Sequence, residues 1–199
     1  MIHALPGMGA DQRMFPPPWD SLPEFRAHDW PRYAGEQTLA EVAEAMCRAA
    51  NINDGDSLIG ASLGGMVAGE ITKIRRIATL YLVGSAVSRE EISAVATRLH
   101  PLLQVAPLDW LRFVAGKIPW ELTRMFAGTE STFIRAVGPA IFQWPGLGPP
   151  RTRVRRIHGR RDHIILPPAR ADLLLNGGHL IAITHARECV NFIQSDFVQ

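Results

Sequence analysis

The chain has 199 residues, of which 47% are hydrophobic, and it carries 21 Lys and Arg against 19 Asp and Glu for a net charge of +2. This length and apolar content suffice for one buried core, which excludes a disordered chain and favours a single domain over residues 1–199. The balanced charge gives no general attraction to nucleic acid or to an anionic membrane, so we expect a small-molecule substrate and neither of those partners.

Targeting and metal signals are missing from the sequence. The first residues, Met1 to Gly7, contain no basic segment followed by a long apolar stretch, and no run reaches the roughly 18 apolar residues of a membrane span. We therefore expect a cytoplasmic protein. Cys47 and Cys189 lie among apolar residues of helical spacing, with no neighbouring Cys or His, which predicts buried thiols without a metal or cofactor.

Strand-length apolar runs alternate with helical patterns, which predicts an α/β protein with a mostly parallel sheet. Strands are expected at residues 1–5, 25–30, 57–59 and 77–83. The capping box Thr38-x-x-Glu41 begins a helix between the second and third of these strands, and a further helix is expected over 66–74.

Prolines then interrupt the pattern between residues 85 and 150, where amphipathic pieces replace the strand and helix alternation. One predicted helix begins at Ser88-x-x-Glu91 and places Ile92, Val95 and Leu99 on its apolar side; another contains Phe133, Ile134, Val137 and Ile141. Strands resume at 153–157 and 171–175, and the last helix carries Ala186, Val190, Ile193 and Phe197 on one face. We interpret 85–150 as a helical insertion.

The third strand runs into Gly60-Ala61-Ser62-Leu63-Gly64. Small residues around a serine permit a sharp strand-to-helix turn that exposes the hydroxyl at the carboxyl end of the sheet, as a nucleophile requires. The Leu63 amide at the helix start would face a developing oxyanion. Glycine-rich turns also bind dinucleotides, but that function needs an acidic residue at the end of the next strand, which here ends at Gly84.

A second glycine turn, Pro6-Gly7-Met8-Gly9, follows the first strand, and the Met8 amide is our candidate for a second oxyanion donor. The alternative is an ordinary turn. Asp11 fits the cap of a short helix better than it fits catalysis.

Two further polar residues follow predicted strands. Asp162 lies in the loop after His158-Gly159, and His179 follows Asn176-Gly177-Gly178. Both are expected at the edge of the sheet where Ser62 is presented, and the chain order serine, aspartate, histidine is typical of one arrangement of the catalytic triad.

These four segments resemble the α/β-hydrolase superfamily over the whole chain outside the insertion. The resemblance implies a three-layer fold in which Ser62 is the nucleophile, His179 the general base and Asp162 the acid that orients it. It also implies an oxyanion hole formed by the amides of Met8 and Leu63, with 85–150 as a helical cap. The chain departs from the family in lacking the N-terminal hairpin, which leaves about six strands. Only 16 residues separate Asp162 from His179, so the helix usual before the last strand is expected to be absent or reduced to a turn.

Several residues compete for these roles. His163, His185, His158 and His3 have weaker contexts than His179, and Glu90 or Glu91 could supply the acid from the end of the preceding strand, although both suit the first turn of a helix. Six arginines between 151 and 161 indicate either an anion site or a solvated rim, and we favour the rim. Trp110, Trp120 and Trp144 are expected to pack the cap.

The sequence thus predicts a serine hydrolase of the carboxylesterase type, acting on a small ester or thioester through an acyl-enzyme. Serine as the nucleophile does not separate an esterase from an amidase, a C–C hydrolase or a lyase that uses the same triad. A binding or signalling protein with this fold and no turnover is the alternative from another class. A homodimer formed through the cap is a further hypothesis.

Overall fold

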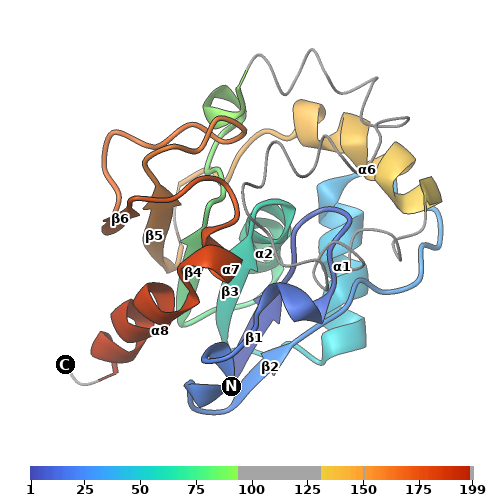
Figure 1. The fold of residues 1–199 in the computed structure, drawn as a ribbon. Coiled ribbons are helices and arrows are strands. Elements are labelled where there is room, and N and C mark those ends of the chain that lie inside the picture. The colour runs from blue at the N-terminus through green and yellow to red at the C-terminus, as the bar shows by residue number, and fades with distance from the viewer. Residues whose placement is uncertain (94–130, 150, 198–199) are drawn as a thin grey trace.

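The computed structural model describes residues 1–93, 131–149 and 151–197. These residues contain six parallel strands in the order β2-β1-β3-β4-β5-β6 (Figure 1). The strands are β1 (Ile2–Leu5), β2 (Phe25–Ala27), β3 (Ser57–Ala61), β4 (Thr79–Val83), β5 (Arg153–Gly159) and β6 (Leu173–Leu175). The predicted parallel α/β sheet is confirmed, although the predicted strand at 25–30 ends at Ala27 and the one at 171–175 begins at Leu173.

Helices cover both faces of the sheet, which gives three layers (Figure 1). One face packs against α1 (Leu39–Ala50) and α2 (Leu63–Ile74), and the other against α8 (Ala186–Ser195), which follows the short α7 (Ile181–Thr184). Helix α6 (Ser131–Gln143) contacts the α1 and α2 layer, with Phe133 and Val137 buried as the helical pattern predicts.

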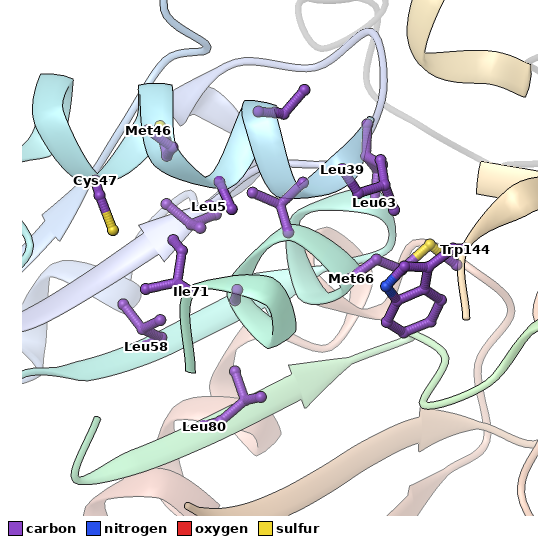
Figure 2. Packing of buried hydrophobic residues seen from close by; sticks show 14 of the residues in the cluster. Leu5, Leu39, Met46, Cys47, Leu58, Leu63, Met66, Ile71, Leu80 and Trp144 are labelled. Carbon is purple, nitrogen blue, oxygen red and sulfur yellow. The ribbon is translucent and has the colours of Figure 1, made fainter. Parts of the chain in front are cut away.

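Alternation along the strands divides the core into two clusters, because successive side chains of a strand point to opposite faces. Leu58 and Leu80 pack against α1 and α2, whereas Ile59 and Tyr81 pack against α8. Figure 2 shows the first cluster, in which Leu58 and Leu80 lie beneath the apolar side of the two helices. Burial on both faces explains why the central strands are apolar throughout.

Helix α1 begins where its capping box predicts. The Thr38 side chain accepts a hydrogen bond from the Glu41 amide at 3.2 Å, and the Glu41 carboxylate accepts one from the Thr38 amide at 3.1 Å. Cys47 in this helix and Cys189 in α8 are both buried free thiols, as expected. Phe197, predicted on the apolar face of the last helix, lies beyond its end and is exposed.

The helix predicted from Ser88 is wrong over its first turn. Residues Arg89–Glu91 form only a 3-10 turn, after which Ile92 is extended and makes an antiparallel bridge with Ile165. The Leu166 amide donates to the Glu91 carbonyl at 2.7 Å, and this pairing with a distant loop competes with continuation of the helix. Val95, Leu99, Trp110 and Trp120 lie outside the described residues, as does most of the predicted insertion.

The strand order places a topological switch between β1 and β3, because the chain leaves β1 toward β2 on one side and returns to β3 on the other. Parallel sheets bind ligands outside the carboxyl ends of the strands at such a switch. The turns at Met8 and Ser62 follow β1 and β3, so both lie at this position.

Candidate active site

Ser62 occupies a strained turn between β3 and α2. Its φ of 51° and ψ of −120° lie in a region that residues with a side chain rarely adopt. The surrounding glycines make the turn possible: a Cβ on Gly60 would overlap the backbone of Gly65, and a Cβ on Gly64 would overlap the carbonyl oxygen of Leu5. The small residues that surround the serine are therefore required by backbone contact.

Ser85 supports this turn from the neighbouring strand end. Its hydroxyl donates to the Ser62 carbonyl at 2.7 Å, and the Ser62 amide donates to the Val83 carbonyl at 3.2 Å. Gly65 leaves the space that the Ser85 side chain fills. Ser85 is fully buried, so the bond holds the backbone of the turn in an environment without competing water.

His179 connects Ser62 to Asp162. Its Nε2 lies 2.9 Å from Ser62 Oγ, and its Nδ1 lies 2.8 Å from Asp162 Oδ2. The three residues come from the turn after β3, the loop after β5 and the loop after β6, all at the carboxyl edge of the sheet. With the proton on Nδ1 donated to the carboxylate, the Nε2 lone pair faces the serine hydroxyl.

Asp162 is held by four donors. Its Oδ1 accepts from the amides of Ile164 at 2.9 Å and Ile165 at 3.0 Å, while its Oδ2 faces His179 and, at 3.3 Å, His158 Nε2. Burial by itself raises the pKa of this carboxyl, but the electrostatic interaction with His179 and the hydrogen bonds from His158, His179 and Ile164 lower it well below its ordinary value. Asp162 is therefore ionised at neutral pH.

The His158 imidazole is buried beside this carboxylate. Its Nε2 also lies 3.0 Å from the Ile165 carbonyl oxygen, and two acceptors at one nitrogen require that nitrogen to carry the proton. Its Nδ1 has no hydrogen-bond partner among the described residues. His158 thus contacts both the loop that carries Asp162 and the Asp162 carboxylate itself.

The backbone amides of Met8 and Leu63 lie beside Ser62, and neither donates to an acceptor in the described part of the chain. Leu63 begins α2, where amides are unsatisfied by the helix itself and the helix dipole favours negative charge. The Met8 turn packs closely on Ser62: a Cβ on Gly7 would lie 3.4 Å from the Ser62 Cβ. The two predicted donors thus flank the serine.

A small cavity opens at Ser62. It measures about 80 Å³, and apart from Ser62 its described lining is apolar: Met8, Leu63, Met66, Ile92, Gly138, Ile141, Phe142, Ile164 and Ile165. The lining comes from the two turns, from α2 and α6, from the segment after β4 and from the loop that carries Asp162. Such a volume accommodates several water-sized groups, and its walls favour an apolar one.

Comparison with solved structures agrees with this topology. The chain superimposes on an N-acyl homoserine lactonase, AidH, bound to N-butanoyl homoserine, with a TM-score of 0.77 and 16% identity over 98% of this chain and 88% of the lactonase. An esterase from Exiguobacterium antarcticum gives a TM-score of 0.75 at 15% identity, covering 100% of this chain and 91% of the esterase. The chain has the α/β-hydrolase fold.

A putative aryl esterase from Burkholderia cenocepacia shares this α/β-hydrolase fold with the chain at a TM-score of 0.72 and 18% identity, over 99% of this chain and 89% of the esterase. No protein-family model matches the sequence, and no curated protein matches it either. None of the described helices combines the length and apolarity needed to cross a bilayer.

In the described part of the chain, the Ser62 hydroxyl bonds to His179 and to none of the competing residues. His163 is exposed, and His185 contacts Thr184. His3 contacts His28 at 2.9 Å and Asp56 at 3.2 Å. Asp11 caps a 3-10 turn, as expected, by accepting from the Arg13 amide.

The alternative acid Glu91 is engaged by an arginine. Its carboxylate accepts two bonds from Arg156, at 2.9 and 2.8 Å, which removes it from competition with Asp162. Arg153 and Arg155 bind Asp196, and no arginine is among the described residues that line the cavity at Ser62. Four of the six arginines are exposed, as a solvated rim requires, whereas Arg155 and Arg156 are half-buried in ion pairs.

Ser85 is a residue of the site that the sequence does not mark. A lone serine after a strand carries no pattern, and its contact with the turn becomes visible only when β4 is placed beside β3. Trp144 was expected in the packing of a cap; it is buried, and its indole N–H donates to Glu70 of α2 at 2.6 Å.

Proposed function

We propose that this chain is a serine hydrolase that cleaves a small ester or thioester through an acyl-enzyme, with Ser62, His179 and Asp162 as its triad. The continuous set of short contacts from the Ser62 hydroxyl through His179 to the Asp162 carboxylate carries the proposal. That serine nucleophile lies on a strained turn that exposes it at the edge of the sheet, as nucleophilic attack requires.

In the first step His179 Nε2 accepts the proton from Ser62 Oγ, and Oγ attacks the carbonyl carbon of the ester. The electron pair of the carbonyl moves to its oxygen, which receives hydrogen bonds from the Met8 and Leu63 amides. Asp162 stabilises the imidazolium that forms and keeps its ring oriented. Because Asp162 stays ionised, its contribution is constant across neutral pH.

The tetrahedral intermediate then breaks its bond to the leaving group, which takes the proton from His179 and departs as an alcohol or thiol. Water enters, gives a proton to His179 and attacks the acyl-enzyme carbonyl. Collapse of the second intermediate returns the proton to Ser62 and releases the carboxylic acid. Each proton transfer in this reaction goes to or from His179.

The cavity supports a substrate with a short apolar group next to the carbonyl. No charged side chain is among its described lining residues, and the volume of about 80 Å³ favours a few carbon atoms over a long chain. AidH is named as a lactonase and the other neighbours as esterases. A lactone is a cyclic ester, so a short-chain lactone belongs among the candidate substrates.

Three features of the proposal concern the rest of the chain. We assign residues 85–150 to a cap within a single 1–199 domain, on the support of α6, whose Gly138, Ile141 and Phe142 line the cavity. A homodimer through this cap and a cytoplasmic location stay predictions of the sequence.

The direct test is hydrolysis of p-nitrophenyl esters of increasing acyl length, together with N-butanoyl homoserine lactone. We expect turnover that is highest for short acyl groups. Ser62→Ala and His179→Ala abolish it, while His163→Ala, which changes an exposed histidine beside the same loop, retains the wild-type rate.

Two results would contradict the proposal. Turnover that persists in Ser62→Ala would place the chemistry elsewhere. A folded wild-type protein that hydrolyses no ester, thioester or lactone in the panel would favour the alternative of a binding protein with this fold.

A further inference from the structure

The loop after β2 reaches across to the Met8 turn. Trp30 Nε1 donates a hydrogen bond to the Gly7 carbonyl oxygen at 3.0 Å. The same oxygen accepts from the Ala10 amide at 3.2 Å, which closes the turn. The Gly7 carbonyl is therefore fixed in direction by two donors, one of them a side chain distant in the sequence.

Fixing this carbonyl also fixes the amide of the next residue. The Gly7 carbonyl and the Met8 N–H belong to one peptide group, and the described peptide bonds are trans except for Pro17-Pro18. In a planar trans peptide the C=O and N–H point in opposite directions. Because the oxygen faces Trp30, the Met8 N–H is directed away from Trp30.

The Met8 end of this peptide group borders the site. Met8 lines the cavity at Ser62, and its amide donates to no acceptor in the described residues. Gly7 lies against the Ser62 side chain, with its own amide 3.1 Å from the Met14 sulfur. A donor that borders the cavity and has no partner among the described residues is available to an oxyanion.

Trp30 is itself held in place by aromatic contacts. Its ring lies 5.3 Å from the Phe133 ring of α6, measured between centroids, and Tyr33 of the same loop contacts Phe133 edge-on at 6.4 Å. These contacts reduce the freedom of the indole, so its N–H is presented to the Gly7 oxygen in one orientation.

We propose that Trp30 is a positioning residue of the oxyanion hole: its indole N–H orients the Gly7–Met8 peptide so that the Met8 amide points at the developing oxyanion. This inference rests on the proposed function. It gives Trp30 no contact with substrate, and its effect is confined to the stabilisation of the tetrahedral state.

The test replaces the donor and keeps the ring. Trp30→Phe loses the N–H and retains an aromatic contact with Phe133, and Tyr33→Phe is the matched control on the same loop. We expect Trp30→Phe to lower kcat about tenfold, with KM changed less than about twofold, since loss of an oxyanion donor affects the transition state. A phenylboronic acid, which forms a tetrahedral anionic adduct on the serine, should bind about tenfold more weakly to Trp30→Phe and unchanged to Tyr33→Phe.

A second variant removes steric effects. Incorporation of 3-benzothienylalanine at position 30 replaces the indole N–H by sulfur at nearly the same shape, and should reproduce the loss in kcat at an unchanged melting temperature. Wild-type kcat and boronate affinity in both variants would overturn the inference, as would a loss that appears only in KM or only in stability.

Failure of the proposed function gives a different result. Wild-type protein that a fluorophosphonate does not label at Ser62 would remove the hydrolase itself and this inference with it. Wild-type protein that is labelled, alongside position-30 variants of equal kcat, would remove only the role of Trp30.

Discussion

Replacing Asp162 by asparagine tests the tautomer that the triad requires. Asp162 Oδ1 accepts from the amides of Ile164 and Ile165 at 2.9 and 3.0 Å. We expect the asparagine oxygen at this position, because the two backbone amides always carry their protons, whereas His179 can give up its Nδ1 proton to become an acceptor. Its NH₂ group then takes the place of Oδ2, 2.8 Å from His179 Nδ1.

This exchange reverses the hydrogen bond to His179. An NH₂ donor stabilises the imidazole with a bare Nδ1 and a proton on Nε2, and that nitrogen then has no lone pair for the Ser62 proton. In triads of this kind, the wrong tautomer lowers kcat by about 10⁴-fold, or about 5 kcal/mol of activation free energy. We expect a loss of that order in Asp162→Asn, although the volume of the side chain is unchanged.

The assay compares kcat for a short p-nitrophenyl ester in wild type and Asp162→Asn, with the melting temperature recorded for both. A folded Asp162→Asn protein that keeps more than about a tenth of the wild-type kcat would refute the reasoning, because correct tautomer and orientation would then be unnecessary.

Three further outcomes follow from single contacts. Gly64→Ala places a methyl group against the Leu5 carbonyl, so we expect the free energy of unfolding to fall by about 1–3 kcal/mol or more. Denaturant unfolding measures this loss, and an unchanged denaturant midpoint would contradict the close packing at the turn. His158→Leu removes a donor to Asp162, whereas His158→Gln keeps an N–H near the same place. We therefore expect kcat to fall more in His158→Leu than in His158→Gln. Equal rates in the two variants would show that the bond from His158 has no part in orienting the Asp162 carboxylate. Burial lowers the pKa of His28 from 6.5 to about 4. The neighbouring His3 and Arg26 act in the same direction, and Asp29 acts against them. As the pH falls, His28 is therefore protonated in the unfolded chain before it is protonated in the folded protein. The contribution of His28 to the free energy of unfolding is full above about pH 6.5 and is lost as the pH drops toward 4. Urea midpoints at about pH 7, 5.5 and 4.5 should decline in wild type and decline less in His28→Gln, and parallel declines would assign the pH dependence to other groups.

The sheet could be predicted from the sequence because its determinants are local and periodic. The continuous apolar run at the fourth strand and the capping box before α1 each depend on neighbouring residues, and both lie where expected. The positions of Ser62, Asp162 and His179 were accessible for the same reason: each follows a predicted strand, and parallel strands present their carboxyl ends at one edge.

The features that the sequence did not predict depend on contacts between distant segments. Ser88 and Glu91 carry a valid helix-start pattern, yet Glu91 binds Arg156 and Ile92 pairs with Ile165, and neither partner can be read from the local sequence. The contact of His158 with Asp162 and that of Trp30 with Gly7 are likewise tertiary, so single residues without a motif gave no signal for them.

The central claim is that Ser62 is a nucleophile activated by His179. The most direct measurement is reaction of the folded protein with a fluorophosphonate, followed by mass spectrometry of its peptides. We predict one adduct, located on Ser62, whose formation slows strongly in His179→Ala. An adduct on another residue, or equal rates of labelling in wild type and His179→Ala, would contradict it.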